Sequence, residues 1–395
     1  MQNRNEGITL IALIITIIIL LILVGVSINL AIKGDLFGSA EKAVSGTNDK
    51  TAQEQTRVDE LMGELGRVEE QQRQDNLPET RVTENTKYVS NGKTAWIPKG
   101  FTVSGIKSEQ SIDNGLVIYD IPEGITPDWT NPDSVKTKYN QFVWIPVEVK
   151  STDTENSIAS FYRSEWTANA STGGDRTAGL STDYTEPDST NDTDDKTGIA
   201  KQIANLTKSI YKYGGFYIGR YEAGTATPRT SGSSQTAEFV VQQDKYPYIY
   251  ITWGKSMSDV SEGAVYLCNN LYSSTNTNYG ATSMLCSGVS WDSMLDFIKD
   301  SSHSVTDSAT WGNYYNSETY KVYRGSVYNN SAWSTANTTT GTEITKNSSV
   351  LLTTGATERN SSKNIYDVAG NCWERTTESD SSSYRVDRGR QLQPR

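Results

Sequence analysis

The longest apolar stretch of the chain covers residues 8–32 and contains no charged residue. A helix of this length rises about 37 Å, which exceeds the ~30 Å hydrocarbon core of a bilayer. A cleaved secretory signal would have a shorter apolar region of about 7–15 residues, and a buried soluble helix rarely stays uncharged for so long. The pattern therefore predicts a transmembrane helix over residues 8–32, preceded by a short leader over residues 1–7.

A different hydrophobic pattern follows this stretch. Between residues 35 and 74, apolar residues recur at spacings of three and four: Val58, Leu61, Met62, Leu65 and Val68. This spacing is typical of an amphipathic helix, and Pro78 would end it. We therefore expect a helical stalk over residues 33–80. Packing of this helix on its own domain and helix-mediated oligomerisation are both consistent with the pattern.

The pattern changes again in the next part of the chain, where short β-type runs replace the helical spacing. Residues 94–97, 115–119 and 142–147 are rich in aromatic and β-branched residues and lie between turn-forming residues. They predict a β-rich first part of a globular head over residues 81–149.

Residues 151–200 are polar and acidic, with 17 Ser or Thr and 10 acidic residues against 3 basic residues. Such a composition buries too little apolar surface to offset the entropy lost on ordering. We expect an acidic, Ser/Thr-rich insertion or linker over residues 150–200.

The charge and composition exclude several functions. The net charge of −11 argues against nucleic-acid binding, which requires clustered Lys and Arg. His303 is the only histidine, which excludes His-rich zinc and iron sites. The three cysteines show no metal-binding spacing. In contrast, 22 Tyr and 9 Trp against 7 Phe indicate a binding surface, because Tyr and Trp combine a large contact area with a polar tip.

The segment Gly7-Ile8-Thr9-Leu10-Ile11-Ala12, followed by the apolar stretch, resembles the N-terminus of type IV prepilins and pseudopilin-like proteins. The resemblance implies cleavage after Gly7, with Ile8 as the new N-terminus. Ala12 stands where that family has a glutamate used in filament assembly, and Glu6 stands where it has a basic residue. We therefore expect a membrane anchor rather than a filament subunit.

A second resemblance covers residues 201–395. The segments 213–222, 246–253, 264–271 and 283–300 are similar in order to those of formylglycine-generating-enzyme-like domains (sulfatase-modifying factors), and the strongest match is Asn-Ile-Tyr-Asp-Val-Ala-Gly-Asn-Cys-Trp-Glu at 364–374. The family has a C-type-lectin-like fold, which also occurs in the variable proteins of diversity-generating retroelements. The resemblance implies an α+β fold of short strands, two helices and much loop, incomplete at its C-terminus.

The catalytic residues of that family are not matched. Its oxidase members use a cysteine pair that follows an Arg-Gly-Gly segment, whereas no cysteine follows Arg388-Gly389-Arg390 here. We therefore expect no catalysis and no catalytic cofactor. Cys268 and Cys286 are consistent either with a disulfide or with free buried thiols.

A structural calcium site is also implied by the resemblance. Carried over to this chain, Asp367 and Glu374 would provide carboxylate oxygens, and Gly370 and Cys372 would provide backbone carbonyls. Calcium takes six to eight oxygen ligands. The alternative is that Asp367 caps a turn and that Glu374 forms an ion pair with Arg375 or Arg385.

The resemblance places the ligand-binding surface in the C-terminal loops, where Ser379, Asp380, Ser382 and Tyr384 are the candidate binding residues. Six further aromatic residues cluster in sequence, and about half of them are expected to line a contact face: Trp311, Tyr314, Tyr315, Tyr320, Tyr323 and Tyr328.

Together these observations predict an α+β protein with a transmembrane helix, an amphipathic stalk and a lectin-like head. The expected function is that of a non-catalytic adhesin or receptor in the cell membrane, with its head outside the cell. Its ligand would be a protein or glycan on another surface. The alternatives are a formylglycine-generating oxidase and a minor pilin-like structural subunit.

Overall fold

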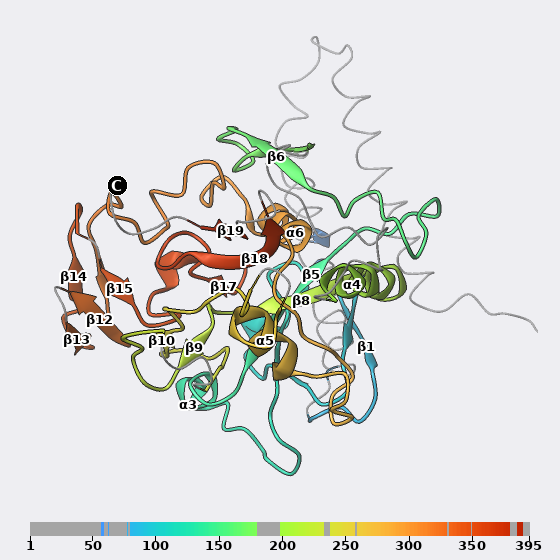
Figure 1. The fold of residues 1–395 in the computed structure, drawn as a ribbon, viewed down its shortest axis with the longest axis horizontal. Helices are drawn as coiled ribbons and strands as arrows, with labels where there is room; N and C mark the ends of the chain where they lie inside the picture. The colour runs from blue at the N-terminus through green and yellow to red at the C-terminus, as the bar shows by residue number, and fades with distance from the viewer. Residues whose placement is uncertain are drawn as a thin grey trace, which may run out of the picture. The chain divides into compact units, whose positions relative to one another are not determined.

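The computed structural model describes residues 81–179, 198–232, 238–256, 259–329, 332–348, 350–379 and 385–389, together with positions 57, 58, 62, 77 and 80 (Figure 1). Two compact units divide the chain, Met1–Gln72 and Arg73–Arg395. In the first unit, the described positions Arg57, Val58 and Met62 are helical and exposed, and the rest of the expected stalk up to Gln72 lies outside the described residues.

The prediction of a membrane-spanning helix is corrected by the structure. In the part of the chain that the structure describes, no helix is both long enough and apolar enough to cross a bilayer. The longest described helix, α4 (Ile199–Tyr213), has 15 residues and polar positions throughout its length. The expected span over residues 8–32 and the processing pair Gly7 and Ile8 lie outside the described residues. A single-pass anchor, and with it the cell-membrane location, therefore has no support in the structure.

The second unit is built around a four-stranded antiparallel sheet with the order β3-β4-β5-β8. Its strands are β3 (Thr102–Val103), β4 (Val117–Tyr119), β5 (Gln141–Pro146) and β8 (Gly215–Gly219). Side chains alternate between the two faces of a strand. Val143 and Ile145 accordingly belong to one core cluster and Trp144 to the other. Because β5 is buried on both faces, it forms a nearly continuous apolar run, and this run is why residues 142–147 were predicted correctly as a strand.

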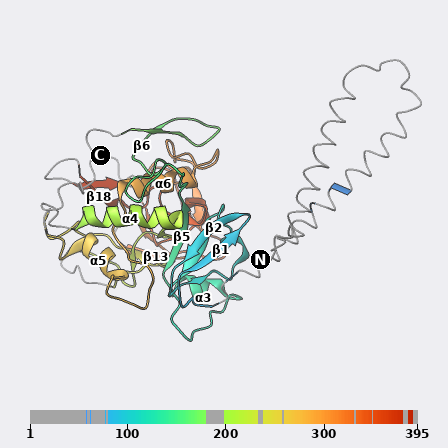
Figure 2. The same cartoon turned by 90° about the vertical axis from the view of Figure 1, so that its right-hand side faces the viewer.

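Two helices supply residues to the core on one face of this sheet (Figure 2). Helix α4 ends at Gly214, whose φ of +78° allows the left-handed cap that turns the chain into β8. Helix α6 (Gly288–Ile298) begins at Ser287, whose hydroxyl accepts a hydrogen bond from the Ser290 amide. Met294 and Ile298 bury the inner side of α6. The shorter helices are α3 (Pro132–Lys136) and α5 (Gly263–Leu271), with 3-10 turns at Lys107–Glu109 and Glu358–Asn360.

The remaining strands form small antiparallel sheets. They are β1 (Thr86–Ser90) with β2 (Lys93–Ile97), β6 (Ser164–Thr167) with β7 (Asp175–Ala178), β9 (Gly224–Thr225) with β10 (Tyr246–Pro247), β11 (Tyr320–Val322) with β14 (Thr342–Ile344), β16 (Ser361–Ser362) with β17 (Ile365–Tyr366), β18 (Glu374–Ser379) with β19 (Arg385–Arg388), and the three-stranded sheet β13 (Ala332–Thr335), β12 (Ser326–Asn329), β15 (Leu351–Leu352).

The expected α+β fold with a membrane-spanning helix is therefore wrong. The regular secondary structure of the described residues consists mostly of small antiparallel sheets, with few helices. The physical reason is local, because apolar runs of a few residues end at positions with left-handed backbone. Asn91 and Gly92, for example, have φ of 51° and 71° and join β1 to β2. Asn and Gly tolerate this conformation, which favours two-residue hairpins.

The acidic segment 150–200 is described as far as residue 179, and this part forms the hairpin of β6 and β7. Arg176 lies over the ring of Tyr162 at 4.2 Å and donates to its carbonyl. Residues 180–197 lie outside the described residues. A polar segment thus still forms a hairpin here. Its two arginines, Arg163 and Arg176, bind carboxylates from other parts of the same chain.

Candidate functional site

The 364–374 segment forms a sequence of tight turns. Lys363 and Asn364 both have positive φ and connect β16 to β17, and Asp367, Gly370 and Asn371 also have positive φ. Asn, Asp and Gly are the residues that adopt this conformation most readily. The segment therefore folds back on itself and brings its polar side chains and carbonyls close to the loop that follows β8.

Three carboxylates lie in and around these turns: Glu222 and Asp367 are buried, and Glu374 is half-buried with its Oε2 atom buried. Asp367 Oδ2 accepts a hydrogen bond of 2.6 Å from the Gly355 amide. Glu222 accepts from the Asn371 side chain at 2.6 Å and from the Cys372 amide at 3.0 Å. These donors are neutral, so they stabilise the carboxylates without bringing a positive charge to the site.

The electrostatic consequence appears in the pKa values. Burial, and then the charges of Asp367 and Glu374, raise the pKa of Glu222 well above its ordinary value. Burial and the charge of Asp367 raise the pKa of Glu374 in the same direction. Burial also raises the pKa of Asp367. Ionising all three carboxyls together is therefore unfavourable, and a bound cation would reduce this cost.

Several oxygens converge beside Gly389. A Cβ atom built on this glycine would lie 3.3 Å from the Cys372 carbonyl oxygen, and 3.8 Å from both Glu374 Oε2 and the Val368 carbonyl oxygen. Glu374 Oε2 is buried and has no hydrogen-bond partner. We call this group the oxygen cradle. Backbone carbonyls and carboxylates are calcium ligands, and the cradle offers three such oxygens, whereas calcium takes six to eight.

The predicted calcium ligands are only partly brought together. Cys372 and Glu374 contribute to the cradle, whereas Asp367 binds the Gly355 amide through one oxygen and leaves Oδ1 without a partner. Gly370 pairs with Asn313 in an isolated bridge. Val368 was not predicted. Within the described ranges, no group of three or more His, Cys, Asp or Glu side chains is arranged to hold a metal ion, so carbonyl oxygens would have to complete a site.

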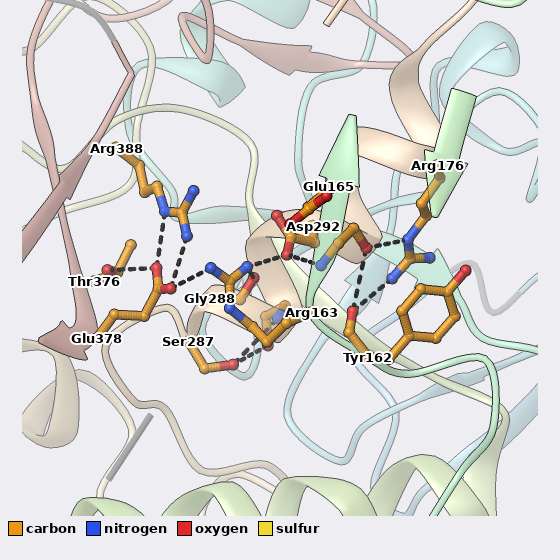
Figure 3. Close-up of polar contacts among 12 residues, drawn as sticks. Tyr162, Arg163, Glu165, Arg176, Ser287, Gly288, Asp292, Thr376, Glu378 and Arg388 are labelled. Carbon is orange, nitrogen blue, oxygen red and sulfur yellow. Dashed lines mark hydrogen bonds and ion pairs between the residues drawn. The ribbon is translucent and has the colours of Figure 1, made fainter. Parts of the chain in front are cut away.

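A buried ion-pair network lies beneath the hairpin of β18 and β19 (Figure 3). Glu378, which is fully buried, accepts hydrogen bonds from Arg388 at 2.7 and 2.8 Å and pairs with Arg163 at 2.5 Å. Arg163 also forms an ion pair with Asp292 of α6. The acidic segment, α6 and the C-terminal hairpin are thus joined by alternating charges.

One of the four predicted ligand-binding residues lies in the described part of this hairpin. Ser379 is the last residue of β18 and is opposite Arg385 in the register. Asp380, Ser382 and Tyr384 lie outside the described residues. The structure therefore shows how the base of this loop is held, through Glu378 and Arg388.

The predicted aromatic cluster is divided between core and surface. Trp311 and Tyr314 are buried in the main core, and Tyr320 is half-buried beneath Arg359. Tyr323 and Tyr328 are exposed. Sequence reasoning missed Trp333, whose ring is tilted by 49° against that of Tyr328, with ring centroids 5.3 Å apart. The alternation of residues in 326–335 would have placed these two rings on one face.

The three cysteines are free thiols, so the possible disulfide between Cys268 and Cys286 does not form. Burial raises the pKa of Cys268 to about 12, which keeps this thiol protonated and unreactive. His303 lies beside Asp300, with 2.9 Å between Nδ1 and Oδ1, and its ring contacts Trp311 edge-on.

Comparison of the chain with protein-family models, curated proteins and solved structures finds no match in any of the three.

Proposed function

We propose that this protein is a non-catalytic binding module whose ligand is a protein or a glycan. The observation that carries the proposal is the identity of its exposed aromatic residues. Within the described part of the chain, the large aromatic side chains with the greatest exposure are all Tyr or Trp: Tyr211, Tyr250, Tyr266, Tyr323, Tyr328 and Trp373. These side chains provide contact area at a low cost in side-chain entropy and retain a polar tip, which favours recognition surfaces.

The scaffold beneath these residues supports the same function. Trp373 follows Cys372, whose amide is bound by the buried Glu222. Tyr250 follows a loop in which Arg229 donates to the carbonyls of Ile249 and Tyr250 and lies over the ring of Tyr248. Side chains displayed from a backbone that is held in this way lose less entropy when a ligand binds. The net charge of −11 favours a ligand other than nucleic acid.

A direct binding experiment tests the proposal. The labelled full chain would be applied to arrays of purified extracellular proteins and of glycans, and each positive would be titrated. We expect saturable binding to at least one ligand, and no turnover of that ligand. Lack of saturable binding, together with oxidation of a cysteine-containing peptide to formylglycine, would instead establish the oxidase alternative.

We also propose that a calcium ion stabilises the 367–374 turns. Glu374 and the carbonyls of Val368 and Cys372 would hold the ion, and its charge would offset the buried carboxylates nearby. The role of the ion would be structural. An ion that binds only the folded chain stabilises it by about 2.7 kcal/mol when the free ion concentration is one hundred times Kd.

Substitution of Glu374 separates calcium binding from general stability. In the Glu374→Gln variant we expect the calcium-dependent rise in the free energy of unfolding to disappear. Without calcium, this variant should be at least as stable as the wild type, because a buried, unpartnered carboxylate is replaced by a neutral amide. Glu343→Gln, at an exposed position of β14, is the matched control. Equal calcium effects in both variants would rule out the oxygen cradle as the site.

A further inference from the structure

Three aromatic side chains gather on the outer face of the sheet β13-β12-β15, and we call them the aromatic platform: Tyr246, Tyr328 and Trp333. Tyr328 and Trp333 are direct partners in the register of β12 and β13. Tyr246, from β10, meets Trp333 edge-on with ring centroids 4.8 Å apart and an interplanar angle of 72°. Rings from two different sheets thus meet at Trp333, which lies between the other two.

The register determines which face carries the platform. Val327 and Leu352 are paired, and both are buried in the core beneath this sheet. Because adjacent residues of a strand point to opposite faces, Tyr328 lies on the outer face, and 37% of its surface is exposed. Trp333 and Tyr246 are half-buried and so are held in place by their neighbours.

The chemistry of this face favours a neutral ligand. Ser326 and Thr335 form the next cross-strand pair on the same side as Tyr328 and Trp333, so two hydroxyl groups lie beside the rings. None of the residues of β12, β13 and β15 carries a charge. In a chain with a net charge of −11, an uncharged face with hydroxyl groups beside its rings is matched to a ligand that is itself uncharged and rich in hydroxyl groups.

The size of the platform decides between a protein and a small ligand. Each ring side chain presents about 150–250 Å² in total, and at most about a third of each is exposed here. The three rings together therefore expose at most about 150–250 Å². A stable protein interface, in contrast, buries about 800 Å² on each partner. One or two sugar rings would cover the platform, but it is too small to anchor a protein alone.

We propose that the aromatic platform binds a neutral carbohydrate. The apolar C–H face of a sugar ring packs on Tyr328 and Trp333, and its hydroxyls reach Ser326 and Thr335. A sugar combines one apolar face with peripheral hydroxyls, which is the combination that this surface complements. The inference rests on the proposed binding function and specifies the ligand class and the residues.

The full chain would be titrated with maltohexaose, cellohexaose and chitohexaose by calorimetry, with saturation-transfer NMR to identify the sugar protons in contact. We expect at least one oligosaccharide to bind, and Trp333→Ala to lower its affinity at least about tenfold, because the stacking surface is lost. Trp333→Phe, which keeps a ring, should retain part of the affinity. Ile125→Ala removes an exposed apolar side chain elsewhere in the chain and should leave the affinity unchanged. Unchanged thermal unfolding would show that each variant is folded.

The outcomes separate this inference from the broader proposal. Equal affinity of a sugar for the wild type, Trp333→Ala and Trp333→Phe would place the sugar elsewhere, which overturns the inference and leaves the binding function intact. Binding to proteins on the array without binding to any of the oligosaccharides would do the same. Lack of binding to every protein, glycan and oligosaccharide would overturn both proposals.

Discussion

Two buried carboxylates, Glu109 and Glu222, have opposite surroundings. Arg220 and Glu222 follow β8 with one residue between them. Arg220 binds Glu109, with 2.8 Å between Nη2 and Oε1, and Lys136 adds a second cation at 3.0 Å. Glu222 accepts hydrogen bonds only from the neutral groups of Asn371 and Cys372 among its described contacts. The two neighbourhoods are buried to a similar degree but differ in their charge balance.

Glu109 and Glu222 are both buried, so the opposite shifts of their pKa values come from the charges that surround each of them. Burial alone would raise the pKa of Glu109, but the charge and hydrogen bond of Arg220, with smaller effects from Lys136 and Ser104, lower it to about 2. Burial and the like charges of its neighbours raise the pKa of Glu222. A bound cation would supply the charge that the second neighbourhood lacks.

The largest effect is expected from removing the cation of the first neighbourhood. Arg220→Met leaves Glu109 buried with Lys136 alone, and breaking a buried pair in this way costs about 3–5 kcal/mol. Urea denaturation would measure the loss. Adding Glu109→Gln to the same chain should restore part of the stability. A loss below about 1 kcal/mol would mean that Lys136 alone balances the carboxylate.

A large effect is also expected from acid. The folded pKa of Glu109, about 2, lies below the ordinary value of 4.5. Its stabilising contribution is therefore complete above pH 4.5 and is lost as the pH falls towards 2. A shift of this size corresponds to about 3 kcal/mol. The free energy of unfolding should fall less steeply between pH 4.5 and pH 2 in Glu109→Gln than in the wild type. The same slope in both proteins would contradict a lowered pKa of Glu109.

A smaller effect is expected at the oxygen cradle. Gly389 has φ of +76°, so Gly389→Ala strains the backbone by about 1–2 kcal/mol and also places a methyl group among the oxygens. Gly124→Ala is the matched control, because its φ is +78° and nothing lies within 4 Å of the new atom. Both variants should lose similar stability without calcium, and only Gly389→Ala should lose the calcium effect. The same calcium response in both would contradict the cradle.

The smallest effect is expected at an exposed ion pair. Lys93 and Asp113 form a surface pair, and such pairs contribute about 0–1 kcal/mol. Lys93→Ala should therefore change the free energy of unfolding by less than about 1 kcal/mol, and added salt should remove the difference. A larger loss would imply that exposed charges matter as much here as the buried pair of Arg220 and Glu109.

The sequence predicted the central strands better than the overall fold. Residues 142–147 form a continuous apolar run, and the run is visible because β5 is buried on both faces. The abundance of small sheets was not visible, because strands such as β9 and β16 have only two residues. Strands this short carry no periodic pattern and exist only where the surrounding structure pairs them.

The motif at 364–374 indicated where to look for a candidate site, but the sequence did not predict which other residues contribute to it. Residues 364–374 were singled out, yet Glu222 lies about 150 positions earlier, and nothing in its local sequence indicates that it faces Asn371. Arg163 was likewise hidden in an acidic segment. Contacts between residues far apart in the chain depend on the fold, so a single sequence does not reveal them.

The long separation between these partners has a consequence during protein synthesis. Arg163 pairs with Glu378, and Glu222 is bound by Asn371 and Cys372. At about 5–20 residues per second, some 7–30 s pass between the synthesis of Glu222 and that of Asn371. During this interval β5 and β8 are already available to pair, while side chains destined for the interior have no partners. The nascent chain on the ribosome is therefore partly folded during this interval, with its central strands synthesised and its C-terminal partners missing. Chaperone assistance would matter most at this stage.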